Sequence, residues 1–381
     1  MSQTLPNGRP GTQPAKILTP GSNFVLPGSG HPSTLFDQNR VDWDVDWLAA
    51  IRRSVRFTDQ LRQLVGLPPE ILVGESSLGE QDERGGKLAP VFPTFVPLEF
   101  LRRIRLGDPN DPLLRQVLPT AAEQTHHDGF VSDPVGDLDA MAASGLIHKY
   151  DGRVLLIASA ACAVHCRYCF RREFPYIDAG SRSENWNPAI RYIELNEDVR
   201  EVILSGGDPL TIVDDPLFDL LERIDSIQHV KRIRFHTRLP IVIPQRITAN
   251  LCKKLRLLRA NVWFVVHANH ANELDQDCLD RLGMLVDSGI PVLNQAVLLR
   301  GVNDDEDSLV DLLLKLVDHK IQPYYLHQLD RVRGTKHFEV SIEKGLSLMH
   351  QIRQRLPGYA VPTYVTEQAG QSSKTPTIEL R

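Results

Sequence analysis

Short β-rich runs alternate with amphipathic helical runs over the chain that follows Tyr150. Apolar residues spaced three and four apart predict helices between the runs, and β-branched and aromatic residues predict strands. The predicted strands cover residues 153–159, 201–206, 232–237, 261–267, 291–297 and 322–328. The predicted helices lie near residues 187–198, 215–227, 245–258, 272–288, 305–319 and 341–355. Repeated βα units predict an α/β fold, a parallel sheet curved into a partial (β/α)6 barrel with its helices outside.

The chain before these repeats has another pattern. Residues 1–42 are rich in Pro, Gly, Ser, Thr and Asn, which predicts a flexible tail. Residues 43–148 contain amphipathic runs interrupted by proline, and they predict a mostly helical subdomain. We expect the barrel over residues 149–338, and a C-terminal segment over residues 339–381.

Composition narrows the class of protein. Hydrophobic residues make up 42% of the 381 residues, which is enough for a full core, and the formal net charge is −5. An acidic balance argues against a nucleic-acid partner or an acidic membrane surface. No apolar run approaches the roughly 20 residues that span a bilayer, and no export signal opens the chain. We therefore expect a cytoplasmic protein without nucleic-acid or membrane partners.

Unusual polar residues fall at the ends of the predicted strands. Because a βα barrel carries its active site at the C-terminal ends of its strands, this placement predicts one shared site. The residues are a cysteine cluster, the turn Ser205-Gly206-Gly207-Asp208, the run His236-Thr237-Arg238, and His267, Gln295 and Asp330.

Three of the five cysteines, Cys162, Cys166 and Cys169, lie within eight residues. Three thiolates can bind three irons of a [4Fe–4S] cubane and leave the fourth iron open. The alternative is a zinc site with His165 as fourth ligand, since structural zinc normally takes four ligands. The CxxxCxxC spacing, with Tyr168 before the last cysteine, favours the cluster. The other two cysteines lie in helical runs, where small buried apolar residues are expected.

This cysteine loop resembles that of radical S-adenosylmethionine (SAM) enzymes, in which SAM binds the open iron and yields a 5′-deoxyadenosyl radical. From residue 149 to residue 376 the chain resembles the lysine 2,3-aminomutase family. The resemblance rests on the segments "YDGRVLL", "CAVHCRYCFRR", "LSGGDPL", "PQRIT", "VLLRGVND", "PYYLHQLD", "GTKHF" and "SKTP". It implies a [4Fe–4S] cluster, SAM and pyridoxal 5′-phosphate (PLP) as cofactors, and an electron donor of the flavodoxin or ferredoxin type.

The resemblance implies that PLP forms a Schiff base with the lysine of the "KTP" motif, which is Lys374 in this chain. It places the PLP phosphate against Arg153 and Lys149, with Tyr150 nearby. Lys149 stands where the family typically has arginine, and His327 stands where it often has tyrosine.

The resemblance also implies contacts to SAM from the turn after the second strand and from two further strand ends. Two glycines in this turn allow the backbone to approach a ligand closely. The implied SAM contacts are Ser205, Gly206, Gly207, Asp208, His267 and Gln295.

Three further residues match positions that hold the substrate in the family. Arg171 matches the partner of the substrate carboxylate, which a guanidinium binds as a fork. Asp330 and Glu367 match the positions at the far end of the substrate, and two carboxylates there favour a cationic side chain. These residues predict L-lysine as substrate. Glu367 stands where free-lysine enzymes usually carry aspartate, which is shorter by one methylene.

The implied reaction converts L-α-lysine into (R)-β-lysine. The chain has no zinc-binding C-terminal extension after Lys374, which predicts the branch that supplies β-lysine to elongation factor P through a ligase related to lysyl-tRNA synthetase. Three alternatives stay open: a free-lysine aminomutase for catabolism or osmolyte synthesis, an aminomutase of another amino acid, and a zinc-binding interaction protein.

Overall fold

The computed structural model describes residues 36–68, 92–176 and 186–377. Most of the tail expected over residues 1–42 lies outside these ranges. Its last residues include a short 3-10 helix, η1 (Gln38–Arg40), whose N-cap is Asp37.

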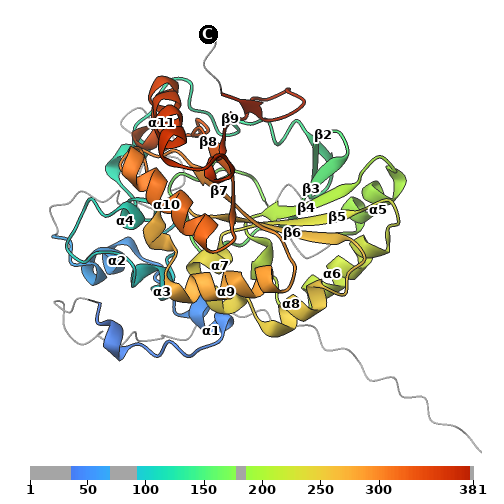
Figure 1. Ribbon diagram of the computed structural model, residues 1–381, viewed down its shortest axis with the longest axis horizontal. Helices are drawn as coiled ribbons and strands as arrows, with labels where there is room; N and C mark the ends of the chain where they lie inside the picture. The colour runs from blue at the N-terminus through green and yellow to red at the C-terminus, as the bar shows by residue number, and fades with distance from the viewer. Residues whose placement is uncertain (1–35, 69–91, 177–185, 378–381) are drawn as a thin grey trace, which may run out of the picture.

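One sheet of ten strands, hydrogen-bonded in chain order from β1 to β10, forms the centre of the molecule (Figure 1). The strands from β3 to β9 pair in parallel, whereas β1, β2 and β10 pair antiparallel at the two edges. The six predicted strands are confirmed as β3 to β8. The bounds are β1 (Met141–Ala143), β2 (Leu146–Tyr150), β3 (Arg153–Ser159), β4 (Glu201–Gly206), β5 (Arg232–Thr237), β6 (Asn261–His267), β7 (Val292–Val297), β8 (Gln322–His327), β9 (Thr363–Thr366) and β10 (Thr375–Pro376).

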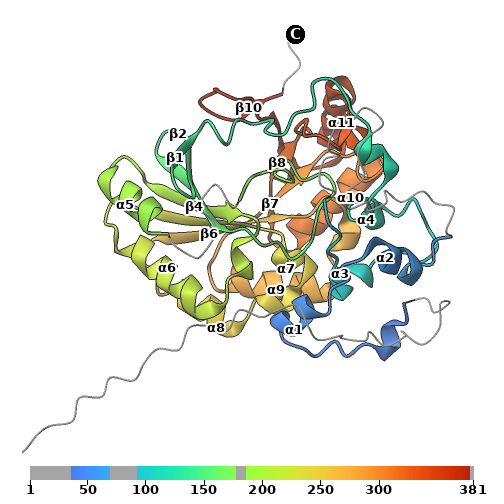
Figure 2. The ribbon, with the colours of Figure 1, turned by 180° about the vertical axis from the view of Figure 1, so that it is seen from behind.

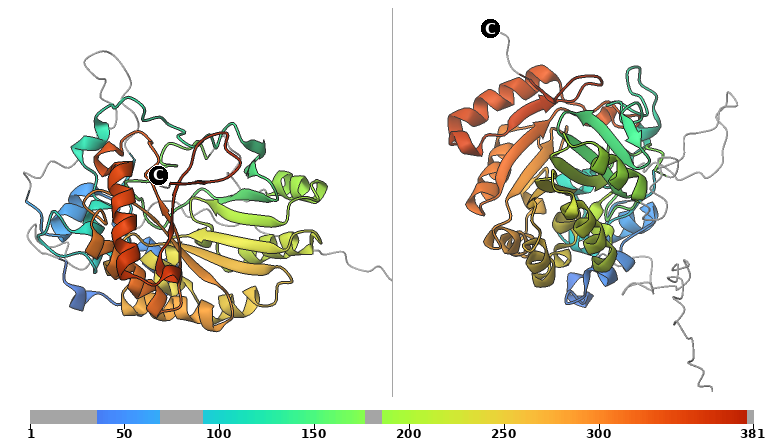
Figure 3. Two further views of the ribbon diagram at one scale, coloured as in Figure 1. Left: turned by 45° about the horizontal axis from the view of Figure 1, so that its top comes forward. Right: turned by 90° about the vertical axis from the view of Figure 1, so that its right-hand side faces the viewer.

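Helices cover the outer face of this curved sheet, as Figure 3 shows from two further sides. Each of the six predicted helices is present between or after the corresponding strands, so the expected partial barrel is confirmed. The helices of the barrel are α5 (Asn187–Leu195), α6 (Asp214–Ser226), α7 (Leu239–Val242), α8 (Ala249–Leu255), α9 (Gln276–Asp287), α10 (Glu306–Asp318) and α11 (Ile342–Arg355). In the described part of the chain, no helix is long and apolar enough to cross a bilayer.

Local sequence explains where these helices begin and which face they bury. In α10, Leu309, Leu312, Leu313 and Leu316 are buried, and their spacing of three and four residues puts them on one side of the helix. Asp305 precedes the helix and its carboxylate accepts the backbone N–H of Ser308, which satisfies a free donor of the first turn. The apolar stripe therefore faces the sheet, and the polar side faces solvent.

The described residues of the segment before the barrel form short helices: α1 (Trp47–Arg52), α2 (Thr58–Leu64), α3 (Leu98–Leu101) and α4 (Pro112–Arg115). They lie together on one side of the molecule, away from β1 and β2 (Figure 2). The strands β1 and β2 belong to the central sheet, and β2 crosses the boundary expected at residue 148. One hydrophobic core joins this segment to the barrel, because proline breaks left its helices too short to enclose a core of their own.

Two glycines bring the turn after β4 against the start of the cysteine loop. A Cβ atom on Gly206, whose φ is +106°, would lie 2.5 Å from the carbonyl oxygen of Ser159. A Cβ atom on Gly207 would lie 2.4 Å from the carbonyl oxygen of Ala161. The Gly207 N–H donates to the Ser159 carbonyl at 2.8 Å, so this contact is also a backbone hydrogen bond. The close approach that needs glycine is therefore made to the end of β3 and to the first residues of the cysteine loop.

We predict that Gly207→Ala separates this turn from the cysteine loop. Overpacking of this kind typically costs about 1–3 kcal/mol of unfolding free energy. Denaturant unfolding and the iron content after anaerobic reconstitution measure the two consequences, and both should fall. Gly283→Ala in α9 is the control, because nothing lies within 4 Å of its added Cβ and alanine favours a helix. Equal iron content and stability in Gly207→Ala would contradict the prediction.

Candidate functional site

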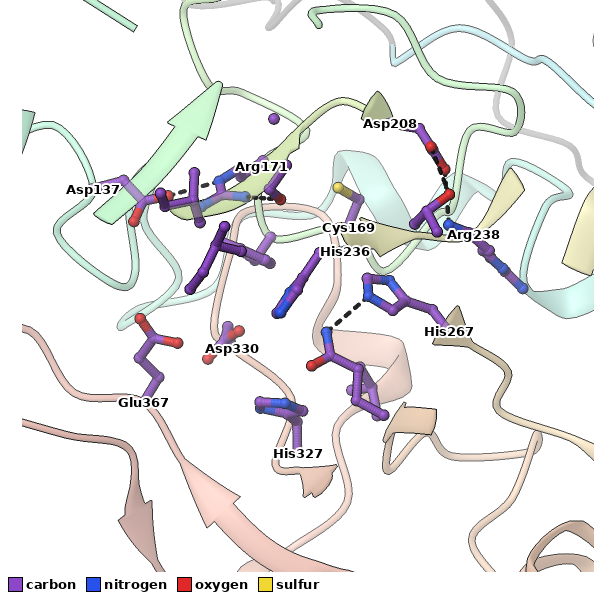
Figure 4. Close-up of a pocket in the computed structure, with 18 of the residues that line it drawn as sticks. Asp137, Cys169, Arg171, Asp208, His236, Arg238, His267, His327, Asp330 and Glu367 are labelled. Atoms are coloured by element: carbon purple, nitrogen blue, oxygen red, sulfur yellow. Dashed lines mark hydrogen bonds and ion pairs between the residues drawn. The ribbon is translucent and has the colours of Figure 1, made fainter. Parts of the chain in front are cut away.

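Residues of the central sheet and of the cysteine loop line a cavity of about 500 Å³, a volume within the size range of small-molecule sites. Every residue that the sequence analysis assigned to the cluster, SAM, PLP or the substrate lines this cavity. They come from β2, β3, the cysteine loop, the C-terminal ends of β4, β6 and β7, and the chain after β8. Figure 4 shows Arg171, His267, Asp330 and Glu367 around the same space.

The cysteine loop is held by residues of the segment before the barrel. The Glu123 carboxylate pairs with Arg167 at 2.5 Å and with Arg172 at 2.6 Å, and all three side chains are buried. The Arg167 N–H donates to the carbonyl of Gln116 at 2.9 Å. The loop has no regular secondary structure, so these contacts fix where its thiols point. Cys162, Cys166 and Cys169 all line the cavity.

The contacts of His165 do not support the zinc alternative. Its Nδ1 atom lies 2.9 Å from the carbonyl oxygen of Pro93, and its ring packs against Phe92 and Phe95. His165 does not line the cavity with the three cysteines. Among the described residues, no group of three or more His, Cys, Asp or Glu side chains is arranged to hold one metal ion. The donor set fits a cubane, in which each thiolate binds a different iron.

Burial raises the pKa of two of the free thiols. The pKa of Cys162 lies well above its usual value, and that of Cys169 rises to about 11, with the neighbouring cysteines adding to the effect of burial. A coordinating metal deprotonates a thiol outright, so the ligand form of these residues requires bound iron.

Asp208 organises the strand ends beside the cluster loop. Its carboxylate accepts the hydroxyl of Thr237 and the backbone N–H of Arg238, both at 2.7 Å. It also accepts the backbone N–H groups of Leu239 and Leu210. A carboxylate with four donors is largely occupied, so a contact between this side chain and SAM stays a prediction.

Polar atoms without partners point to a ligand at the ends of β5 to β7. Gln295 donates through its Nε2 atom to His267 Nε2 at 2.9 Å. Burial, with Arg238 and Arg171 nearby, lowers the pKa of His267 to about 3, so its imidazole is neutral. Within the described residues, Gln295 Oε1 and His236 Nε2 are buried without a hydrogen-bond partner. Buried polar groups are normally paired, so these atoms fit a polar cofactor such as SAM.

Arg171 is fixed by a carboxylate that sequence reasoning missed. Asp137 lies before β1, is buried, and accepts from Arg171 Nε at 2.7 Å. Its other oxygen pairs with Lys149 Nζ at 2.5 Å. Burial by itself would raise the pKa of Asp137, but the attraction of Arg171 and Lys149 lowers this pKa below its usual value. Arg171 also donates to the Ser205 hydroxyl at 3.3 Å, so it lies between the acidic side of the cavity and the β4 turn.

The hairpin of β9 and β10 brings Lys374 into the cavity. Lys374 Nζ donates to the Glu367 carboxylate, which also accepts from Lys149 and from the Tyr150 hydroxyl, each at 3.2 Å. Burial opposes ionisation, but Lys374 and Lys149 lower the pKa of Glu367 to about 2. Burial and the charge of Glu367 raise the pKa of Asp330 to about 7.

A basic region beside Tyr150 fits a phosphate. The Arg153 guanidinium lies 4.6 Å from the Tyr150 ring, and no carboxylate of the described residues lies within ion-pair distance of it. Arg234 pairs with Glu201 at 2.5 Å and keeps a buried Nε without a described partner. His327 is buried with its Nε2 unpaired among the described residues. Charged and neutral donors left free in this way fit the phosphate and ring substituents of PLP.

Sequence reasoning missed Asp137, Arg234, Glu201 and Glu123. Arg234 and Glu201 occupy predicted strands, and their charge inside a barrel strand was a usable signal. Asp137 and Glu123 lie in irregular chain, where an acidic residue is unremarkable, so no signal marked them.

Comparisons with known proteins agree with this site. The chain matches the family described as "4Fe-4S single cluster domain" over residues 151–265. L-lysine 2,3-aminomutase of Escherichia coli (strain K12) is 40% identical over 339 residues, which cover 88% of this chain and 96% of that protein. L-lysine 2,3-aminomutase of Clostridium subterminale is 34% identical over 343 residues, which cover 90% of this chain and 80% of that protein.

The chain belongs to the L-lysine 2,3-aminomutase family. It is therefore an isomerase of the radical SAM type with a [4Fe–4S] cluster, and the resemblance inferred from its motifs is confirmed. Among solved structures, Streptococcus suis SuiB bound to S-adenosylmethionine aligns with a TM-score of 0.41 and 14% identity, over 57% of this chain and 51% of that chain.

We predict that Asp137→Asn destabilises the protein by roughly 3 kcal/mol at pH 7, because the buried Arg171 and the partly buried Lys149 lose their shared carboxylate. The native pKa of Asp137 is lowered, so its stabilising effect is present above the unfolded pKa of about 3.8 and is lost as the pH falls through the native pKa. Denaturant unfolding at several pH values measures this, and the difference from wild type should shrink below about pH 4. The exposed Asp139→Asn is the control, and an equal effect of both variants would contradict the prediction.

Proposed function

We propose that this chain is a PLP-dependent L-lysine 2,3-aminomutase that converts L-α-lysine into (R)-β-lysine. The proposal depends mainly on how charged side chains are distributed in one cavity. Arg171 lies in the cysteine loop, and the carboxylates of Asp330 and Glu367 line the same cavity as Lys374. When bound, the cluster and SAM supply a radical, and PLP supplies an aldehyde that takes up the substrate α-amino group.

Arg171 is proposed to bind the substrate carboxylate. It lines the cavity two residues after Cys169, and its guanidinium can hold a carboxylate as a fork. Asp137 holds Arg171 by its Nε, which leaves the remaining guanidinium nitrogens facing Ser205 and the cavity. A substrate bound here lies next to the proposed SAM contacts, and that proximity is the main contribution of the protein.

Asp330 and Glu367 are proposed to bind the ε-ammonium group. Both line the cavity, and burial together with repulsion from Glu367 raises the pKa of Asp330. A cation placed between them removes that repulsion, whereas a third carboxylate would add to it, which favours lysine over glutamate. Lys374 now contacts Glu367, so a substrate ammonium can take over this partner when Lys374 turns to PLP.

Anaerobic reconstitution tests the proposed function. The chain is loaded with iron, sulfide, PLP and SAM, reduced, and given L-lysine, L-ornithine or L-glutamate, and chiral chromatography identifies the product. We expect (R)-β-lysine from lysine, little from the other two, and none from Lys374→Ala or Cys166→Ala. Borohydride reduction followed by mass spectrometry should place a pyridoxyl group on residue 374. Lys344→Ala, whose lysine pairs with Asp304 outside the cavity, is the control.

A wild-type chain that turns over ornithine or glutamate better than lysine would replace the substrate with that amino acid. Full turnover by Lys374→Ala would remove Lys374 from PLP binding. A preparation with zinc and no iron would favour the interaction protein.

The pKa of Asp330 predicts the pH dependence of lysine binding. Because this pKa is raised to about 7, the carboxyl group is neutral below that pH and charged above it. The substrate ε-ammonium, with an unperturbed pKa of about 10.4, stays charged over the same range. The KM for lysine should fall as the pH rises from 6 to 8. In Asp330→Asn the KM should be higher, and it should no longer fall between pH 6 and pH 8. A pH profile identical to that of the wild type would remove Asp330 from the substrate site.

The use of the product is proposed from the sequence resemblance alone. In the branch that the motifs resemble, (R)-β-lysine modifies a lysine of elongation factor P through a ligase related to lysyl-tRNA synthetase. Intact mass measurement of the factor, with and without this chain in the producing cell, separates the two uses of β-lysine. A mass that does not depend on the chain would favour free-lysine metabolism.

A further inference from the structure

A buried arginine contacts one of the three cluster cysteines. Arg238 follows β5, its side chain is 5% exposed, and its Nη1 donates to Cys166 Sγ at 2.7 Å. In the described part of the chain, no arginine or lysine side chain donates to the sulfur of Cys162 or Cys169. Of the three proposed cluster ligands, Cys166 therefore accepts a hydrogen bond from a cationic side chain, and within the described residues Cys162 and Cys169 do not.

The guanidinium of Arg238 is fixed on several sides. Its Nη2 donates to Gln116 Oε1 at 2.7 Å and to Glu273 Oε2 at 2.8 Å. The rings of Phe100 and Tyr168 lie 5.4 Å and 5.6 Å from its central carbon. A guanidinium held in this way keeps its place when the charge of the cluster changes.

The partners of Arg238 form a connected buried network. Gln116 donates to Glu273 Oε1 at 3.0 Å, and the same oxygen accepts the backbone N–H of Asn269 at 2.9 Å. The Asn269 amide donates to Gln116 and to the Tyr168 hydroxyl. Glu273 is fully buried, and its ion pair with Arg238 is its single one within the described residues. One carboxylate therefore balances the cation next to the cluster.

The structure leaves one more donor of this arginine free. Arg238 Nε is buried and has no hydrogen-bond partner among the described residues. Arginine is always charged, and an unpaired buried donor on it is costly. An acceptor brought by the cluster or by SAM would satisfy it, so the side chain fits a site that holds these groups.

We propose that Arg238 tunes the reduction potential of the [4Fe–4S] cluster through Cys166, and that Glu273 sets how much of its positive charge the cluster experiences. Hydrogen bonds to ligand sulfurs and nearby charge are established determinants of cluster potential. An added electron makes the cluster and its thiolates more negative, so a fixed cationic donor stabilises the reduced state. The proposal rests on the cluster alone and not on PLP, lysine or the product.

The charge argument predicts opposite shifts from the two partners. Arg238→Gln removes the cation, so the cluster potential should become more negative. Glu273→Gln keeps the size of the side chain and an acceptor oxygen but leaves the cation unbalanced, so the potential should become less negative. Arg238→Lys keeps a charge without the planar fork and should give a value between wild type and Arg238→Gln.

The experiment uses the full chain, reconstituted anaerobically with iron and sulfide and without PLP or lysine. Electron paramagnetic resonance of the reduced cluster, followed during a redox titration, gives the midpoint potential of each variant. Iron content near four per chain and the thermal unfolding midpoint show that the cluster and fold are intact. Arg102→Gln is the control, because Arg102 pairs with Asp275 and Asp277 outside the cavity, and its potential should match wild type.

Equal potentials in wild type and Arg238→Gln, with the cluster intact, would overturn the proposal. Midpoint potentials that shift in the same direction in Arg238→Gln and Glu273→Gln would also overturn it. A common shift is explained by repacking around the cluster and needs no effect of charge. If Arg238→Gln or Glu273→Gln cannot bind a cluster, the direction of the potential shift in the remaining variant decides whether the proposal holds. Failure of the lysine reaction would leave the potentials unaffected, so this test is independent of the proposed substrate.

Discussion

The position of the cysteine loop depends on one buried carboxylate, Glu123, which Arg167 and Arg172 share. A loop without helix or strand has no ladder of its own hydrogen bonds, so its neighbours must hold it. Glu123 does this from the segment before the barrel, and Gly207 does it from the turn after β4. Burial raises the cost of separating these charges, because a buried ion without its partner is strongly unfavourable. The three thiols face one space because the loop is fixed from both sides.

Charge pairing governs the rest of the cavity. Asp137 balances Arg171 and Lys149, while Glu367 balances Lys374. Among the described residues no cation forms an ion pair with Asp330, and burial together with the charge of Glu367 raises its pKa to about 7. In the free protein this is an unfavourable arrangement for a carboxylate. It is the arrangement that a cationic substrate group improves, which connects the electrostatics of the cavity to the proposed choice of lysine.

Two residues that depart from the pattern implied by the sequence resemblance lie together in this structure. The resemblance implies an arginine at position 149 and an aspartate at position 367, where this chain has Lys149 and Glu367. Here Lys149 Nζ lies 3.2 Å from Glu367, and the longer glutamate also contacts Lys374. The two substitutions therefore belong to one group of ion pairs. The region expected to hold the PLP phosphate and the region expected to hold the substrate ammonium are connected through it.

Sequence alone predicted the three cysteines that line the cavity, the six central strands and the helices between them. Cysteine spacing and hydrophobic periodicity are local features, so they can be recognised in a stretch of roughly ten to fifteen residues. It did not reveal β1, β2, β9 or β10, because two to five residues are too few to show a period. Only the tertiary structure brought Asp137 to Arg171, 34 residues away, and Glu273 to Arg238, 35 residues away. Such ion pairs depend on how the strands and the irregular chain before β1 pack, and neighbouring residues in the sequence carry no record of that packing.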